Sequence, residues 1–270
     1  MPKIPIGEIE LYYEEHGAGE PVVLIPGFSN GLWIWFKQVP AFSQRFRTIT
    51  FDPRGISRSA APDRPGSIGT IADDVAALLG ALKIERAHIL GASFGGFVAQ
   101  EFALAYPQMT RSLILCCTSF GGPQHIPPPL STLQAIASTR ELNTEARVRE
   151  NLLLAFSPGY LVKNQAEVEK IIEMRAANVV PEYVYLHQLQ AALVFNASAR
   201  VSEISAPTLV ITGDGDIIVP FENSRHLAAR IPNSELVIIA GGSHTFFIER
   251  SDEFNRAVIE FIESIGTAGS

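Results

Sequence analysis

Length, composition and charge place this chain among ordinary globular proteins. Its 270 residues suffice for one large domain, or for one domain that carries an insertion. Hydrophobic residues make up 47% of the chain and charged residues 18%, a balance that excludes a disordered chain. The net charge of -7 argues against nucleic acid and against an anionic membrane as partners.

The cysteines and the N-terminal residues indicate a compartment. The only two cysteines, Cys116 and Cys117, are neighbours in an apolar run. Neighbouring residues of a strand point to opposite faces, so we expect buried thiols in a reducing compartment rather than a disulfide. We find no apolar core of a signal peptide and no run of roughly 18 apolar residues that could span a membrane. These features predict a cytoplasmic protein.

Apolar runs alternate with helical patterns along the first 120 residues. Alternation over residues 4–13 predicts an antiparallel hairpin at a sheet edge. Helices are predicted over residues 33–42 and from residue 68 to residue 82. Buried strands are predicted at 21–25, 47–51, 87–90 and 113–117. Strands that are apolar on both faces and alternate with helices predict a mainly parallel sheet covered on both sides.

The pattern changes near Gly121. Glycines and prolines interrupt the alternation over residues 121–129, and residues 130–199 contain only helix-like segments. Strand signals return at 207–212 and 235–240, with helices predicted at 221–230 and around 254–265. We therefore predict a core domain made of residues 1–120 and 206–270, with residues 121–205 forming a helical cap inserted into it.

The strongest functional signal is the stretch Gly91-Ala92-Ser93-Phe94-Gly95. It joins a predicted strand to a predicted helix. A serine on such a sharp turn needs small neighbours, and its hydroxyl stands clear of the backbone near the first amides of the helix. A dinucleotide fingerprint requires glycine in place of Ser93, and a phosphate-binding loop requires a Gly-Lys-Ser/Thr that is missing. The pattern predicts a nucleophile elbow.

Two later strand ends supply partners for Ser93. Functional groups gather at the carboxyl ends of the strands of a doubly wound sheet. Asp214 and Asp216 follow the strand at 207–212, and His244 follows the strand at 235–240. His244 is predicted to be the base that takes the proton of Ser93, and a carboxylate is predicted to orient it. We favour Asp216 because the loop must extend past the strand to reach the histidine, and Asp214 remains the alternative.

An acyl-transfer serine also needs donors for the developing oxyanion. We expect them from the backbone N–H groups of Phe94, which follows the nucleophile, and of Phe28 in the glycine loop after the strand at 21–25. Asp214-Gly215-Asp216 resembles the beginning of a calcium loop, but the ligands that should follow are missing. No metal and no cofactor are expected.

The remaining histidines have no comparable setting. His88 is expected to pack in the core, because it lies within the strand before the elbow. We expect His16 and His226 to lie at the surface. His125 and His187 are expected in the cap, where they could line a pocket.

Together these motifs resemble the α/β-hydrolase fold. They are similar to the branch that contains 3-oxoadipate enol-lactonases, small carboxylesterases, cofactor-free haloperoxidases (perhydrolases) and meta-cleavage C–C hydrolases. The matching segments are 26–28, 52–55, 91–96, Gly213 with Asp216, 219–220 and 242–244. The family usually has glycine where Ser57 stands, which we interpret as a change in turn packing that leaves the triad intact. The resemblance implies an eight-stranded, mostly parallel sheet flanked by helices, with the cap inserted after the sixth strand.

These residues predict a serine hydrolase that acts on a carboxylic ester or lactone through an acyl-enzyme on Ser93. Its substrate is expected to be a small, largely apolar molecule. A C–C bond hydrolase or a perhydrolase with the same triad is an alternative, and so is a non-catalytic small-ligand receptor. Dehalogenases and epoxide hydrolases need aspartate at position 93. Monomer and homodimer both remain open. Substrate contacts are expected from Phe28, Phe94, Trp33, Phe156, Tyr183 and Phe246.

Overall fold

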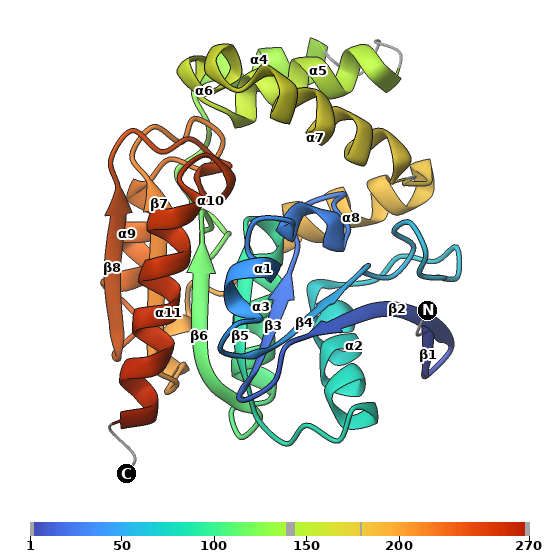
Figure 1. Ribbon diagram of the computed structural model, residues 1–270, viewed down its shortest axis with the longest axis vertical. Helices are drawn as coiled ribbons and strands as arrows, with labels where there is room; N and C mark the ends of the chain where they lie inside the picture. Colours follow the sequence, from blue (N-terminus) through green and yellow to red (C-terminus); the bar gives the residue numbers. More distant parts are fainter. Residues whose placement is uncertain (1–2, 139–143, 179, 268–270) are drawn as a thin grey trace.

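An eight-stranded sheet forms the centre of the computed structural model (Figure 1), which describes residues 3–138, 144–178 and 180–267. The strand order is β1-β2-β4-β3-β5-β6-β7-β8. β1 pairs with β2, and β2 with β4, in antiparallel fashion, whereas all other neighbours are parallel. The strands are β1 Lys3–Ile6, β2 Ile9–His16, β3 Pro21–Ile25, β4 Arg47–Phe51, β5 Ala87–Ala92, β6 Thr110–Cys116, β7 Thr208–Gly213 and β8 Ser234–Ile239.

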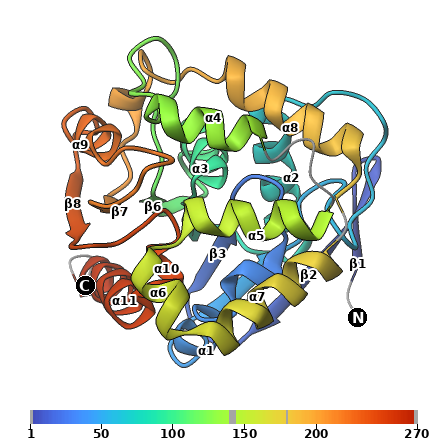
Figure 2. The same cartoon turned by 90° about the horizontal axis from the view of Figure 1, so that it is seen from above.

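Helices cover both faces of the sheet (Figure 2). α2 (Ile68–Ala81) and α3 (Phe94–Ala105) lie on one face, and α1 (Val39–Phe42) and α11 (Ser251–Thr267) lie on the other. Successive residues of one strand therefore enter different clusters of buried side chains. Val23 of β3 packs in the cluster under α2 and α3, while Val22 packs in the cluster under α11. This two-sided burial explains why the central strands are apolar without alternation.

The helix predicted over residues 33–42 is divided. The structure has a 3₁₀-helix at Leu32–Trp35 and the short α1 at Val39–Phe42. Pro40 accounts for the division, because it has no N–H to donate and its ring clashes with the preceding turn of a continuous helix. In α1 it occupies the first turn, where no backbone donor is needed.

Between β6 and β7, the described residues form five α-helices that lie over the carboxyl ends of the strands (Figure 1). We call α4–α8 the cap; the chain returns from it to the sheet through a 3₁₀-turn at Val201–Glu203 and then β7. Beyond β7, α9 (Glu222–Ala228) leads to β8, and α10 (Phe246–Glu249) precedes α11. Within the described residues, no helix is both long enough and apolar enough to cross a membrane. The cap helices are α4 Leu130–Ser138, α5 Thr144–Ala155, α6 Pro158–Lys163, α7 Gln165–Ala177 and α8 Glu182–Val194.

Ser57, the departure from the usual glycine, has a φ angle of 49°. This angle lies in the left-handed region that favours glycine. The serine therefore adopts a backbone conformation that a glycine would favour, at some conformational cost.

Candidate active site

The turn between β5 and α3 holds Ser93 in a strained conformation. Its φ and ψ angles are 54° and -118°, and it lies immediately before the first helical residue. The flanking glycines are required by contact distances: a Cβ on Gly91 would lie 2.1 Å from the carbonyl oxygen of Gly95, and a Cβ on Gly95 would lie 2.3 Å from the carbonyl oxygen of Ile25. Strain of this kind persists only where the surroundings enforce it, and it is typical of active sites.

Residues of β6 and its following loop enforce the position of Ser93. Its N–H donates to the carbonyl of Cys116 at 2.8 Å. Its carbonyl accepts from the hydroxyl of Thr118 at 2.8 Å and from the N–H of Gly96 at 2.8 Å. Both backbone groups of Ser93, its N–H and its carbonyl, are thus hydrogen-bonded, and these bonds do not involve its hydroxyl.

The hydroxyl of Ser93 begins a chain of hydrogen bonds. Its Oγ lies 3.1 Å from Nε2 of His244, and Nδ1 of His244 lies 2.7 Å from Oδ2 of Asp216. The buried carboxylate of Asp216 also accepts the backbone N–H groups of Ile218 and Val219, both at 2.8 Å. A carboxylate can only accept, so Nδ1 carries a proton, and in the neutral imidazole Nε2 faces Ser93 as an acceptor. The structure brings these three predicted residues together in the order that proton transfer requires.

Asp214, the alternative acid, lies elsewhere. It is exposed, and its carboxylate accepts the backbone N–H of Gly241 at 2.6 Å. Asp214 therefore braces the loop after β8, and the carboxylate that contacts the histidine is that of Asp216.

Two opposing influences act on His244. Burial, the largest single influence, disfavours its charged form, but the Asp216 carboxylate and the neighbouring Cys117 together outweigh burial and raise the pKa of His244 to about 9. Burial raises the pKa of the neighbouring Cys117 thiol well above its usual range, so this thiol is neutral at pH 7. Cys117 is buried, as the sequence predicted, and its sulfur lies 3.7 Å from that of Cys116 without a disulfide.

Cys117 also forms a cluster of possible metal ligands with Asp216 and His244. Their ligand atoms lie within 4.8 Å of one another, and no other such cluster occurs in the described part of the chain. A metal would need the thiolate, whereas burial keeps the thiol protonated, and Asp216 and His244 already bind each other. The cluster does not fit a metal site.

The loop after β3 lies against the elbow. A Cβ on Gly27 would lie 3.5 Å from the Cβ of Ser93. In the described parts of the chain, the next amide, that of Phe28, donates to no protein acceptor, and neither does the amide of Phe94 at the start of α3. Two unbonded N–H groups therefore border Ser93, as an oxyanion site requires.

Sequence reasoning missed the groups that hold this loop. Asp52, fully buried at the end of β4, accepts the N–H of Leu32 at 3.0 Å and the Nε–H of Arg58 at 2.8 Å. From the cap, Arg175 and Gln188 bind the backbone of Ser29. Asp52 belongs to a segment that the resemblance had marked, but no motif marked the two cap residues.

The predicted substrate contacts have different environments. Trp33 and Phe156 both belong to the cluster of packed side chains on the α11 face, where Phe156 stacks on Tyr160 with ring centroids 5.2 Å apart. The prediction for Phe246 is wrong, because its side chain is 0% exposed and packs edge-on against Phe254. α10 begins at Phe246 directly after the His244 loop and turns this side chain into the core.

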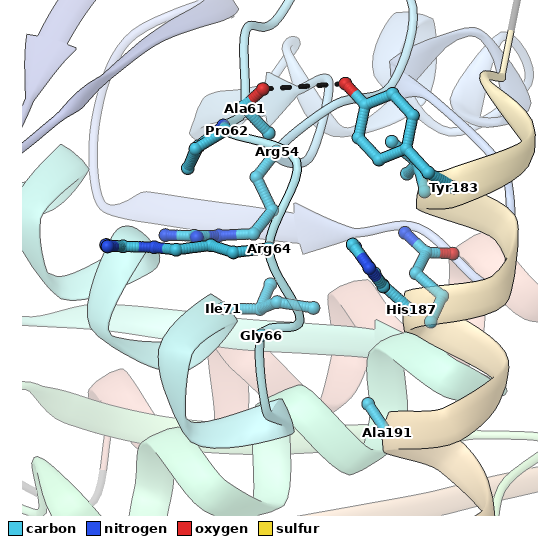
Figure 3. A pocket seen from close by; sticks show the side chains of 11 residues that line it. Arg54, Ala61, Pro62, Arg64, Gly66, Ile71, Tyr183, His187 and Ala191 are labelled. Atoms are coloured by element: carbon cyan, nitrogen blue, oxygen red, sulfur yellow. Dashed lines mark hydrogen bonds between the residues drawn. The ribbon is translucent and has the colours of Figure 1, made fainter.

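Tyr183 and His187 line a pocket between α8 and residues 54–66. Figure 3 shows both side chains facing Arg54 and Arg64 across this pocket, with the Tyr183 hydroxyl 3.5 Å from the carbonyl of Ala61. The residues lining this pocket do not include Ser93, Asp216 or His244. Tyr183 was predicted to contact the substrate, whereas the structure places it in a separate pocket at the junction of cap and core.

His88 and His226 have the settings that the sequence predicted, whereas His16, expected at the surface, is half-buried. His88 is fully buried between Ser112 and Glu20, at 2.7 and 3.1 Å, and burial lowers its pKa. His226 is exposed, and His125 is half-buried against Ser119.

Comparison with known proteins identifies the family. Residues 20–251 match the sequence model described as the alpha/beta hydrolase fold. The chain belongs to the α/β-hydrolase fold family. The resemblance and the fold class predicted from the sequence are therefore confirmed.

Relatives in this family carry several activities in their names. A protein from Azorhizobium caulinodans named as a carbamate hydrolase, RutD, is 31% identical over 98% of this chain and 99% of its own. A 2-hydroxy-6-oxononadienedioate/2-hydroxy-6-oxononatrienedioate hydrolase from Paraburkholderia xenovorans is 32% identical over 95% of this chain and 91% of its own. The enol-lactonase structure from Burkholderia xenovorans LB400 is 26% identical, with a TM-score of 0.86 over 97% of this chain and all of that one.

Proposed function

We propose that this α/β-hydrolase is a serine hydrolase that cleaves a carboxylic ester or lactone of a small, largely apolar molecule. The observation that carries the proposal is the unbroken hydrogen-bond chain from Ser93 through His244 to the buried Asp216. The relatives named as carbamate hydrolase and enol-lactonase support it, since carbamates and lactones also present a carbonyl carbon to a nucleophile.

Each group of the site has a task in this reaction. His244 Nε2 accepts the proton of Ser93 as Oγ attacks the carbonyl carbon, and Asp216 stabilises the resulting imidazolium. The amides of Phe28 and Phe94 donate to the oxyanion. His244 then gives its proton to the leaving alcohol, and a water activated by the same histidine releases the acid from Ser93.

A second candidate is hydrolysis of a C–C bond with the same three residues. The relative from Paraburkholderia xenovorans and the structure of a meta-cleavage product hydrolase from Pseudomonas fluorescens, 26% identical with a TM-score of 0.83, favour it. The two candidates differ in the shape of the substrate site rather than in the residues that transfer protons.

Hydrolysis of p-nitrophenyl butyrate by the native protein and by Ser93→Ala tests the proposal. We expect the substitution to lower kcat by at least about 10³-fold, because it removes the nucleophile. Ser202→Ala, at an exposed serine in the 3₁₀-turn before β7, is the matched control and should leave the rate unchanged. Rates near background in all three proteins would overturn the esterase assignment and direct the next assay to C–C substrates, peracid formation and ligand binding.

A further inference from the structure

The loop that carries Phe28 has an unfavourable conformation. Ser29 has a φ angle of 55°, in the left-handed region that is unfavourable for a residue other than glycine. Its hydroxyl is buried and, among the described residues, has no hydrogen-bond partner. Within the loop, the N–H of Asn30 donates to Gly27 at 3.1 Å, and its side-chain amide donates to the carbonyl of Phe28 at 3.2 Å. Contacts from outside the loop must therefore hold Ser29 in place.

The cap supplies these contacts on both sides of Ser29. The side-chain oxygen of Gln188, on α8, accepts the N–H of Ser29 at 2.8 Å. The guanidinium of Arg175, on α7, donates to the carbonyl of Ser29. The ring of Tyr185, also on α8, packs edge-on against Phe28 with centroids 4.9 Å apart. Two cap helices thus hold one dipeptide of the core.

Both polar groups are committed to this task. Gln188 is 5% exposed, and its bond to Ser29 is the one hydrogen bond that its side chain makes to the described protein. Arg175 forms no ion pair with any described acid, and burial lowers its pKa. Arg175 is half-buried, and holding a guanidinium there without a carboxylate is costly, so its bond to a single carbonyl points to a geometric role rather than to stability.

The bond to Gln188 also distinguishes the backbone amide of Ser29 from that of Phe28. Gln188 occupies the N–H of Ser29, whereas the N–H of Phe28, one residue earlier, has no acceptor among the described residues. Orienting the peptide between Phe28 and Ser29 restricts the rotation of Phe28, and hence the direction of its own N–H.

We propose that Gln188 and Arg175 are positioning residues of the oxyanion hole, so that the cap completes the catalytic site as well as covering it. The inference rests on the proposed function. It predicts that losing either contact weakens binding of the transition state more than binding of the substrate.

The test compares Gln188→Leu, which removes the acceptor, with Gln188→Glu, which keeps it. Hydrolysis of p-nitrophenyl butyrate yields kcat and KM. Inhibition by an alkyl trifluoromethyl ketone, which adds to a serine as an oxyanion, is measured beside its parent methyl ketone. We expect Gln188→Leu to lower kcat and the affinity for the fluorinated ketone by about 10- to 100-fold, with KM and the affinity for the methyl ketone within about twofold. Gln188→Glu should recover most of both losses.

Arg175→Met and Arg175→Lys form the second pair, with the same expectation. This pair carries the test if Gln188→Leu does not fold. Gln190→Leu, at an exposed glutamine of the same helix, is the matched control and should match the native protein.

Three outcomes are decisive. If Gln188→Leu and Arg175→Met keep the native kcat and the native affinity for the fluorinated ketone, the positioning role is refuted. A higher KM at unchanged kcat would also refute it, because the residues would then be substrate contacts. A native protein that hydrolyses no ester would overturn the proposed function itself, which separates that failure from the failure of this inference.

Discussion

The imidazole of His244 shows how burial and charge set the chemistry of a single side chain. Burial disfavours the imidazolium, while the Asp216 carboxylate, 2.7 Å from Nδ1, and the neighbouring Cys117 favour it and together prevail, so the pKa lies at about 9. The base must be neutral to take the proton of Ser93. A raised pKa therefore leaves much of the free protein with a protonated, inactive base at pH 7.

This pKa predicts an alkaline activity profile. For the native protein, kcat/KM for p-nitrophenyl butyrate should rise with pH through a midpoint at about 9, as His244 loses its proton, and level off about one unit above that midpoint. Asp216→Asn removes the charge that favours the imidazolium but keeps the burial that disfavours it, so its midpoint should shift to lower pH. Its plateau should fall by about 10⁴-fold. A midpoint at or above the native one in Asp216→Asn would contradict this account of the pKa.

Two glycines with different surroundings give a second prediction at this scale. A Cβ at Gly95 would lie 2.3 Å from a backbone oxygen of β3, whereas a Cβ at Gly80, near the end of α2, meets nothing within 4 Å. We expect Gly95→Ala to lower the free energy of unfolding by more than about 3 kcal/mol or to prevent folding. Gly80→Ala should raise it by about 0.5–1 kcal/mol. Urea unfolding followed by circular dichroism measures both, and equal stabilities would show that the elbow can relax.

At the scale of elements, the cap holds a second loop of the site. The carbonyl of Ala155, the last residue of α5, accepts three hydrogen bonds from the residues on either side of His244. The hydroxyls of Ser243 and Thr245 donate at 2.7 Å each, and the N–H of Thr245 donates at 3.0 Å. The cap thus binds the loop of the base at one end and the loop of Phe28 at the other.

This contact predicts a stability effect. Thr245→Val keeps the size of the side chain and removes one donor, and it should lower the free energy of unfolding by about 0.5–1.5 kcal/mol. Thr245→Ser, which keeps the hydroxyl, should retain this hydrogen bond and serves as the control. The measurement is the midpoint of urea unfolding. A stability of Thr245→Val at or above that of Thr245→Ser would show that the hydroxyl contact contributes nothing.

At the scale of the whole molecule, the arrangement of helices on both faces of the sheet follows from local patterns of apolar residues in the sequence. Strands such as β3 and β5 are buried along nearly their whole length because helices cover both faces of the sheet. The helical period of α2 and the capping box at Ser67 define its first turn. Prediction was weakest at residues 33–42, where the apolar pattern suited a helix but Pro40 allowed only two short ones.

The sequence by itself determined the fold class, the order in which Ser93, Asp216 and His244 follow one another along the chain, and the glycine-flanked elbow. Such features depend on residues close together in the chain, where periodicity and turn chemistry act. The tertiary structure alone decided that Asp216 rather than Asp214 contacts His244, that Phe246 is buried, and that the cap binds the loop of Phe28. Gln188 and Ser29 are 159 residues apart, and no local pattern encodes a contact between two surfaces that meet only after both have folded.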